Sequence, residues 1–192
     1  GKIQNFLKVD RLMTGKIEDL LNQQYQRLSD LEKPVMYWLA INRKPVLLAQ
    51  LREDIYPSPD YRQLRDAVQS LIRRSLIETT DKGYTLQNVI MEYMTDKLRE
   101  GICAEIKSGK LDDPDKFNRY ALLKASAEDY IRRTQKRLII NQIMDYLNSE
   151  FSEQLVFHLK SIIYLVKSKK LRGYAAGILI NLFCNSNRPA NL

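Results

Sequence analysis

The chain contains one histidine and two cysteines, which leaves few side chains for catalysis or for metal binding. Cys103 and Cys184 are far apart, form no metal-ligand spacing and fit a reducing compartment. His158 lies between Phe157 and Leu159 in a helical stretch, so we expect a packing or surface role for it. Because a Ser-His-Asp or Cys-His site needs an imidazole, these arrangements are nearly excluded. We therefore expect a chain that is not an enzyme by itself.

The sequence also lacks the motifs and segments that mark several classes of protein. It has no GxxxxGK[ST] phosphate-binding loop, no glycine-rich dinucleotide loop and no HExxH zinc motif, so no cofactor or metal is expected in this chain. No apolar run reaches the roughly 20 residues that a membrane span needs. The first residues do not resemble a signal peptide, which favours a cytoplasmic location.

Apolar and basic residues, in contrast, are abundant. At 192 residues and 44% apolar content, the chain has enough core-forming side chains for one large or two small domains. Its formal net charge of +8 permits nucleic-acid binding but does not establish it. The densest basic run, Arg132–Arg137, is also what a solvated helical turn looks like.

Residues 27–94 show the pattern of three short helices. Ser29 and Glu32 have the spacing of a capping box, so a first helix is predicted over Asp30–Asn42. A second helix, over Leu47–Glu53, would turn Leu47, Leu48 and Leu51 inward. A third helix is predicted over Asp60–Arg74, and its buried face would comprise Tyr61, Leu64, Val68, Leu71 and Ile72.

A hairpin and a long helix are predicted next. Leu76–Thr79 and Tyr84–Leu86 flank the turn Thr80–Gly83, whose glycine suits a position with positive φ. The long helix should run over Gln87–Ile106. This order is that of a winged helix: three helices and a β-hairpin wing. Such modules either read DNA or act as packing and switching elements inside larger proteins.

The predicted organisation has five parts. Residues 1–27 form a helical leader that we interpret as the end of an upstream helical domain, and residues 28–108 form the winged helix with its long following helix. Residues 109–115 form a linker, residues 116–185 an α-helical linker domain, and residues 186–192 a frayed tail. The fold class is thus mainly α. The sequence leaves open whether the C-terminal half packs on the winged helix or swings free of it.

The third helix offers one candidate nucleic-acid surface. Arg62, Arg65, Gln69 and Arg73 recur at helical spacing beside the buried face. In a DNA-reading winged helix such a face enters the major groove, where arginine contacts guanine. The alternative interpretation is a solvated face, since Asp66 weakens its positive field.

Five strings resemble one protein family: RLSDLEKPVMYWLAINRKPV, LIRRSLIE, GYTLQNVIMEYMTDKL, FNRYALLKASAEDYIRRTQ and LRGYAAGILINLFC. They are similar to the segment after the nucleotide-binding core of large cyanobacterial STAND-class (NB-ARC) NTPases that carry C-terminal WD40 or pentapeptide repeats. The resemblance covers nearly the whole chain. It implies a winged helix followed by an α-helical linker bundle, without the catalytic core.

The resemblance also implies a role and a site. In that family the winged helix folds over ADP bound to the core and swings away when the protein is activated and oligomerises. A Met-His-Asp motif after the wing contacts the nucleotide, and here that position reads Leu86-Gln87-Asn88. Gln87 can donate a hydrogen bond to phosphate but brings no charge. The alternative is that Gln87 and Asn88 only cap the following helix.

Three functional hypotheses follow. The first is a non-catalytic regulatory segment of a STAND-class NTPase. It would latch the nucleotide-binding core, which binds ADP or ATP in the parent protein, and relay its state to the C-terminal repeats. Its partners would be that upstream core and the downstream repeat domain, with homo-oligomers on activation and no membrane. The second is a winged-helix DNA-binding transcriptional regulator, and the third is a protein-interaction module.

Overall fold

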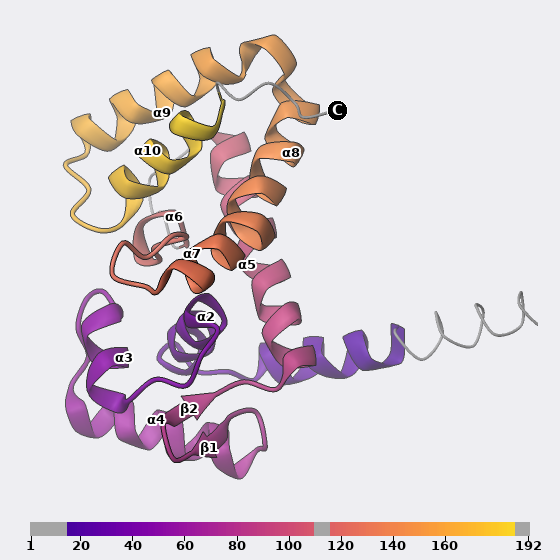
Figure 1. Cartoon of the computed structure of the whole chain (residues 1–192), viewed down its shortest axis with the longest axis vertical. Coiled ribbons are helices and arrows are strands. Elements are labelled where there is room, and N and C mark those ends of the chain that lie inside the picture. Colours follow the sequence, from indigo (N-terminus) through magenta and orange to yellow (C-terminus); the bar gives the residue numbers. More distant parts are fainter. Residues whose placement is uncertain (1–14, 110–115, 187–192) are drawn as a thin grey trace, which may run out of the picture.

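The computed structural model describes residues 15–109 and 116–186, and it is mainly α-helical with one two-stranded sheet (Figure 1). Residues 15–26 are helical and precede the labelled elements. The first group of elements is α2 (Glu32–Asn42), α3 (Leu48–Asp54), α4 (Tyr61–Arg73), β1 (Glu78–Thr80), β2 (Gly83–Thr85) and α5 (Asn88–Ser108). The second is α6 (Lys116–Arg119), α7 (Asp129–Gln135), the π-helical turn η1 (Lys136–Ile140), α8 (Asn141–Phe151), the 3-10 turn η2 (Ser152–Gln154), α9 (Leu155–Ser168) and α10 (Ala175–Ser186).

The predicted capping box starts the first of these helices. The Ser29 amide donates to a Glu32 carboxylate oxygen at 2.8 Å, and the Glu32 amide donates to the Ser29 hydroxyl at 3.2 Å. Arg74 also contacts the Glu32 carboxylate, at 3.2 Å. Burial alone would raise the pKa of the Glu32 carboxyl. The hydrogen bonds of Glu32 to Ser29 and Ser70 and the charge of Arg74 outweigh burial, so the net effect is a lowered pKa. The ionised Glu32 carboxylate therefore stabilises the folded state at neutral pH, and this stabilisation is lost as the pH falls through the lowered pKa.

The hairpin forms at the predicted place, although β1 begins at Glu78 instead of Leu76 and β2 ends at Thr85 instead of Leu86. Thr80 pairs with Gly83 across the two-residue turn, and Glu78 pairs with Thr85 at the open end. An isolated antiparallel bridge joins Tyr84 to Val46, with N–H···O distances of 2.9 and 3.0 Å. The segment before α3 thus pairs with β2 at one residue. Gly83 has φ of +125°, and a Cβ there would lie 2.4 Å from the Val46 carbonyl oxygen. Both facts require glycine at this position.

Helix α5 connects the two groups of elements. Figure 1 shows it running from the hairpin up along α8. It ends at Gly109, which is left-handed with φ of +61°, and the His158 ring lies against this end with Nε2 2.7 Å from the Ile106 carbonyl oxygen. The His158 ring also stacks on Phe151, with ring centroids 4.1 Å apart. The expected packing role of His158 is therefore confirmed.

One apolar cluster includes buried residues from both groups of elements. We call residues 15–109 the N-terminal half and residues 116–186 the C-terminal half. Because the cluster is continuous, the C-terminal half packs on the N-terminal half, which answers a question that the sequence left open. The predicted leader, linker and tail fall partly outside the described residues, so the predicted domain limits remain predictions.

Three local predictions are wrong. Leu47, expected to point inward, is 61% exposed because it precedes α3 in an extended conformation. Tyr61 is 51% exposed because it is the first residue of α4, and burial begins only one turn later, at Leu64. Residues 120–128, expected to be helical, form an irregular connection that ends at Glu128, the N-cap residue of α7. Tyr120 and Leu122 of this connection are buried.

The close approach at Gly83 leads to a test of the hairpin. We expect Gly83→Ala to lower the free energy of unfolding by about 1–3 kcal/mol, since strained backbone and a backbone clash both cost energy. Gly177→Ala is a matched control in α10, where an added Cβ would meet nothing within 4 Å. Because alanine is the better helix former, the control should gain up to about 1 kcal/mol. Urea denaturation measures both variants, and equal effects would contradict the described turn.

Candidate functional site

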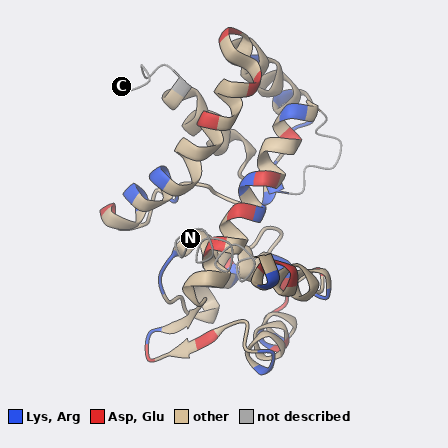
Figure 2. Ribbon diagram, turned by 90° about the vertical axis from the view of Figure 1, so that its right-hand side faces the viewer, with Lys and Arg blue, Asp and Glu red and all other residues tan. Residues whose placement is uncertain are grey.

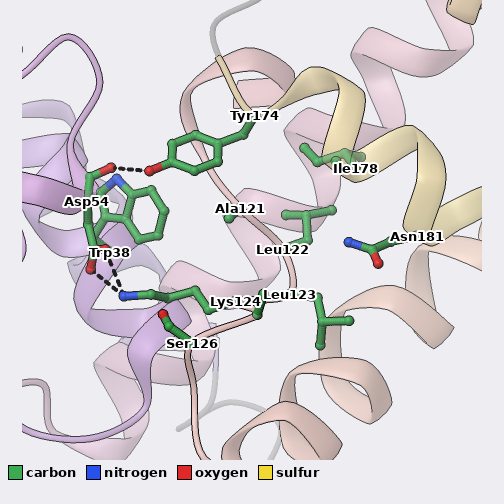
Figure 3. A pocket seen from close by; sticks show the side chains of 12 residues that line it. Trp38, Asp54, Ala121, Leu122, Leu123, Lys124, Ser126, Tyr174, Ile178 and Asn181 are labelled. Carbon is green, nitrogen blue, oxygen red and sulfur yellow. Dashed lines mark hydrogen bonds and ion pairs between the residues drawn. The ribbon is translucent and has the colours of Figure 1, made fainter.

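The most elaborate polar cluster of the described chain lies at the junction of the two halves and centres on Lys124. Its ammonium group lies 2.7 Å from each carboxylate oxygen of Asp54 and 3.0 Å from the Asn42 side-chain oxygen. The side chains of Lys124 and Asp54 are only 10% and 11% exposed. Figure 3 shows Lys124 reaching Asp54 from the irregular connection before α7. The pair joins the halves by a charge-assisted contact that water scarcely reaches.

The positions of Asn42 and Asp54 explain why a cation is favourable here. Asn42 is the last residue of α2, and Asp54 is the last residue of α3. Helix C-termini carry partial negative charge, so the ammonium group of Lys124 is stabilised by two helix ends as well as by Asp54. The Asn42 amide nitrogen donates to the Trp38 carbonyl and to Asp54, at 2.9 and 3.0 Å. These hydrogen bonds and the ion pair satisfy the charged groups of the cluster.

Gln135 adds a second connection. It is the last residue of α7, directly before the π-helical turn, and it is fully buried. Its side-chain nitrogen donates to the Ile41 carbonyl at 2.8 Å, and its side-chain oxygen accepts from the Lys124 amide at 3.1 Å. One amide therefore ties the end of α2, the irregular connection and α7 together.

Aromatic side chains form the third part of the junction. The Tyr174 hydroxyl donates to the Asp54 carbonyl at 2.9 Å, and its ring lies 5.2 Å from the Trp38 ring. Tyr120 packs against Tyr37 and Trp38, with centroid distances of 5.0 and 5.9 Å. Each of these contacts crosses from one half to the other, so α2 is covered on this side by the C-terminal half.

A pocket of about 380 Å³ opens beside these residues. Its wall includes Trp38, Lys124, Tyr174, Ile178 and Asn181, and Figure 3 shows the Asn181 amide directed toward Leu122 and Leu123. The Trp38 indole nitrogen has no hydrogen-bond partner among the described residues. Figure 3 shows this nitrogen next to Asp54 and on the side of the Tyr174 hydroxyl. What the junction can do is hold the two halves in one orientation.

The proposed nucleotide-sensing position lies away from this junction. Leu86 is buried, as expected of an apolar anchor, whereas Gln87 and Asn88 are exposed where α5 begins. The Gln87 side chain makes no capping hydrogen bond to the helix. Gln87 therefore occupies the N-cap position of α5, as the alternative interpretation expects, but its side chain does not bond the free amide groups. A contact of these residues with nucleotide remains a prediction.

The candidate DNA-reading residues share one solvent-facing side of α4. Arg62, Arg65, Gln69 and Arg73 are all exposed. Arg65 makes an exposed ion pair with Asp66 at 3.6 Å. The structure thus brings the four residues together, while their role in DNA binding remains a prediction.

Other candidate chemistry is weak in the described parts of the chain. Within residues 15–109 and 116–186, no group of three or more His, Cys, Asp or Glu is placed to hold a metal ion. Burial raises the pKa of the Cys103 thiol to about 11, so this thiol stays protonated at neutral pH. Across the same residues, every helix is too short or too polar to cross a membrane.

The sequence reasoning missed the junction residues Asn42, Asp54, Lys124, Gln135 and Tyr174. One signal was available in α2, whose residues from Pro34 to Ile41 include no charged or amide side chain. A helix that is apolar all round must be covered on all sides. The three-helix segment covers only part of this surface, so the C-terminal half was needed to cover the rest. The identity of the polar partners could not be inferred in this way.

Because the ion pair of Lys124 and Asp54 is buried, truncation of Lys124 should lower the stability of the fold strongly. We expect Lys124→Met to lower the free energy of unfolding by about 3–5 kcal/mol, because Asp54 is left buried without its counter-charge. Lys44→Met is a matched control, since Lys44 makes a more exposed ion pair with Glu128, also between the halves. The control should change the same quantity by less than about 1 kcal/mol. Thermal and urea unfolding measure both, and a Lys124→Met variant as stable as the parent would contradict the described junction.

Comparison with known proteins places the chain beside one long relative. It is 36% identical, over 219 aligned positions, to the uncharacterized WD repeat-containing protein alr2800 of Nostoc sp. (strain PCC 7120). The alignment covers 95% of this chain but 17% of that protein. No protein-family model matches the chain. No solved structure matches it either. The comparison supports the coarser part of the expected resemblance, an association with a cyanobacterial WD-repeat protein.

Proposed function

We propose that this chain is a non-catalytic regulatory segment of a STAND-class (NB-ARC) NTPase, consisting of a winged helix and an α-helical linker. The relative supports this proposal because its name records WD repeats and because it is far longer than this chain. The order of three helices and a hairpin, with the extra bridge between Val46 and Tyr84, supports the winged-helix part. In this proposal the segment acts in the cytoplasm, between a nucleotide-binding core and WD repeats.

The observation that carries the proposal is the buried junction around Lys124. A relay must transmit a movement of one part to the next, and a loose connection would dissipate that movement. Here α5 of the N-terminal half packs along α8 of the C-terminal half. Lys124, Gln135 and Tyr174 bond the C-terminal half to the ends of α2 and α3. When the winged helix swings away from the core, the C-terminal half would therefore move with it.

The contact with the nucleotide would differ from the family pattern. Gln87 is exposed at the start of α5 and carries no charge, so it would offer ADP on the core a neutral hydrogen bond only. Packing of the winged helix on the core would then contribute most of the latch. Release of this packing would free the parent protein to exchange ADP for ATP and to form homo-oligomers.

Nucleotide exchange in the longer parent protein tests the latch. We expect ADP release to be roughly 5- to 150-fold faster from the bare core than from a protein that includes this segment, the range of typical coupling energies. Gln87→Ala should change the rate little, because the neutral contact contributes little. Equal release rates with and without the segment would overturn the proposal.

The same parent protein tests the relay. With Lys124→Met, ADP and ATP should still bind, but hydrogen exchange in residues 116–186 should no longer differ between the two nucleotide states. Lys44→Met, which removes only an exposed ion pair, should keep that difference. Retention of the difference in the Lys124→Met variant would show that the junction does not transmit the state.

The exposed face of α4 favours a second candidate function, a DNA-binding transcriptional regulator. Arg62, Arg65 and Arg73 face solvent together, as a major-groove helix requires. If this function holds, the chain binds mixed duplex DNA at physiological salt, and Arg62→Gln/Arg65→Gln/Arg73→Gln abolishes binding. Fluorescence anisotropy measures this, and duplex binding that the variant shares would exclude the α4 face.

A further inference from the structure

A dense group of cations lies on α7 and η1, outside the junction and outside the α4 face. Arg132, Arg133, Lys136 and Arg137 occupy two consecutive turns, and the three arginines are exposed. Figure 2 shows Lys and Arg on successive turns of this helix, near the end opposite η2. We call these four residues, together with Tyr130, the basic stripe.

The charges of the basic stripe are poorly compensated. Arg132 has one distant partner, Asp129 at 3.7 Å, and in the described parts of the chain Arg133, Lys136 and Arg137 have no ion pair. Arg133 and Arg137 are four residues apart, a spacing at which like charges destabilise a helix. The half-buried cations Lys97 and Arg99 of α5 differ, since each pairs with an acid on the same helix. The uncompensated charge points to an anionic partner.

The surroundings of these cations indicate which anion fits. Tyr130 is 54% exposed and lies one turn before Arg133 on the same side of the helix. A hollow of about 360 Å³ lies along the same helix and is lined by Leu123, Asp129, Arg132, Arg133 and Lys136, without Tyr130. An exposed aromatic ring among arginines is the combination that holds a single nucleic-acid strand, because the ring stacks on a base and the cations contact phosphates.

The opposite side of the same helix is fixed. Ile131, Gln135 and Ile139 are buried, and Gln135 bonds the Ile41 carbonyl. The basic stripe is therefore held on a rigid support. On α4, by contrast, the arginines are spread over three turns, and Asp66 pairs with one of them.

We propose that the basic stripe binds single-stranded nucleic acid, with Arg132, Arg133, Lys136 and Arg137 on the phosphates and Tyr130 stacked on a base. Affinity arises from charge and stacking, so it is independent of sequence and falls steeply with salt. This site is separate from the proposed latch and from the α4 face. It would allow a nucleic-acid strand to bind directly to the half that the junction couples to the winged helix.

Fluorescence anisotropy of the whole chain with a labelled 20-nucleotide mixed single strand tests the proposal. We expect a Kd of roughly 1–100 µM near physiological salt. Arg133→Gln/Lys136→Gln/Arg137→Gln should weaken binding at least tenfold and reduce the slope of log K against log salt by about 2, at roughly 0.7 per phosphate contact. Arg62→Gln/Arg65→Gln/Arg73→Gln removes the same charge from α4 and should leave single-strand binding within about twofold.

Tyr130→Ala separates stacking from charge. It should weaken single-strand binding roughly tenfold and leave the weaker binding to the matching duplex unchanged. Circular dichroism and thermal unfolding confirm that each variant is folded, as expected for exposed positions. Absence of single-strand binding, or equal losses in the α4 and α7 variants, would overturn the proposal and leave an acidic protein surface as the partner to test.

Discussion

The structure depends on the burial of α2. From Pro34 to Ile41 this helix presents only apolar and aromatic side chains, all of them buried, so it has no side that water could cover favourably. Helices α3, α4 and α5 and strand β2 cover part of it. Tyr120, Tyr174 and Gln135 cover the rest from the C-terminal half. The packing of the two halves is therefore a consequence of one helix that cannot face solvent.

Burial of an apolar helix does not by itself select one orientation of the two halves. Apolar surfaces are largely non-directional, whereas hydrogen bonds and ion pairs are satisfied only at particular distances and angles. The ends of α2 and α3 contribute Asn42 and Asp54, and Lys124 meets both at 2.7–3.0 Å. A shifted arrangement would leave the Asp54 charge buried without a partner, which is strongly unfavourable. The polar cluster thus provides the directional part of the interface.

The junction and the two exposed charged surfaces have different relations to function. A buried and fully bonded contact suits transmission of movement, because its two sides cannot move independently. The exposed α4 face and the basic stripe suit contact with a further molecule. The basic stripe combines an exposed aromatic ring, Tyr130, with three cations that lack ion pairs in the described residues. The chain would thus carry both a mechanical connection and a binding surface on the same helix, since Gln135 lies between Arg132 and Arg137.

Local features were determined by the sequence itself. Ser29 and Glu32 cap α2, and Asp60 caps α4. Gly83 and Gly109 adopt positive φ angles. Each of these features depends on residues a few positions away in the sequence. Helical periodicity likewise predicted the ends of α4 and α5 to within two residues.

The exposure of Leu47 and Tyr61 was not predictable, since it depends on where the core ends. The pairing of Lys124 with Asp54, the burial of Gln135 and the irregular path of residues 120–128 were decided only by the tertiary structure. These residues are 11 to 94 positions from their partners, and nothing in the local sequence specifies which distant helix end will need a cation or an amide.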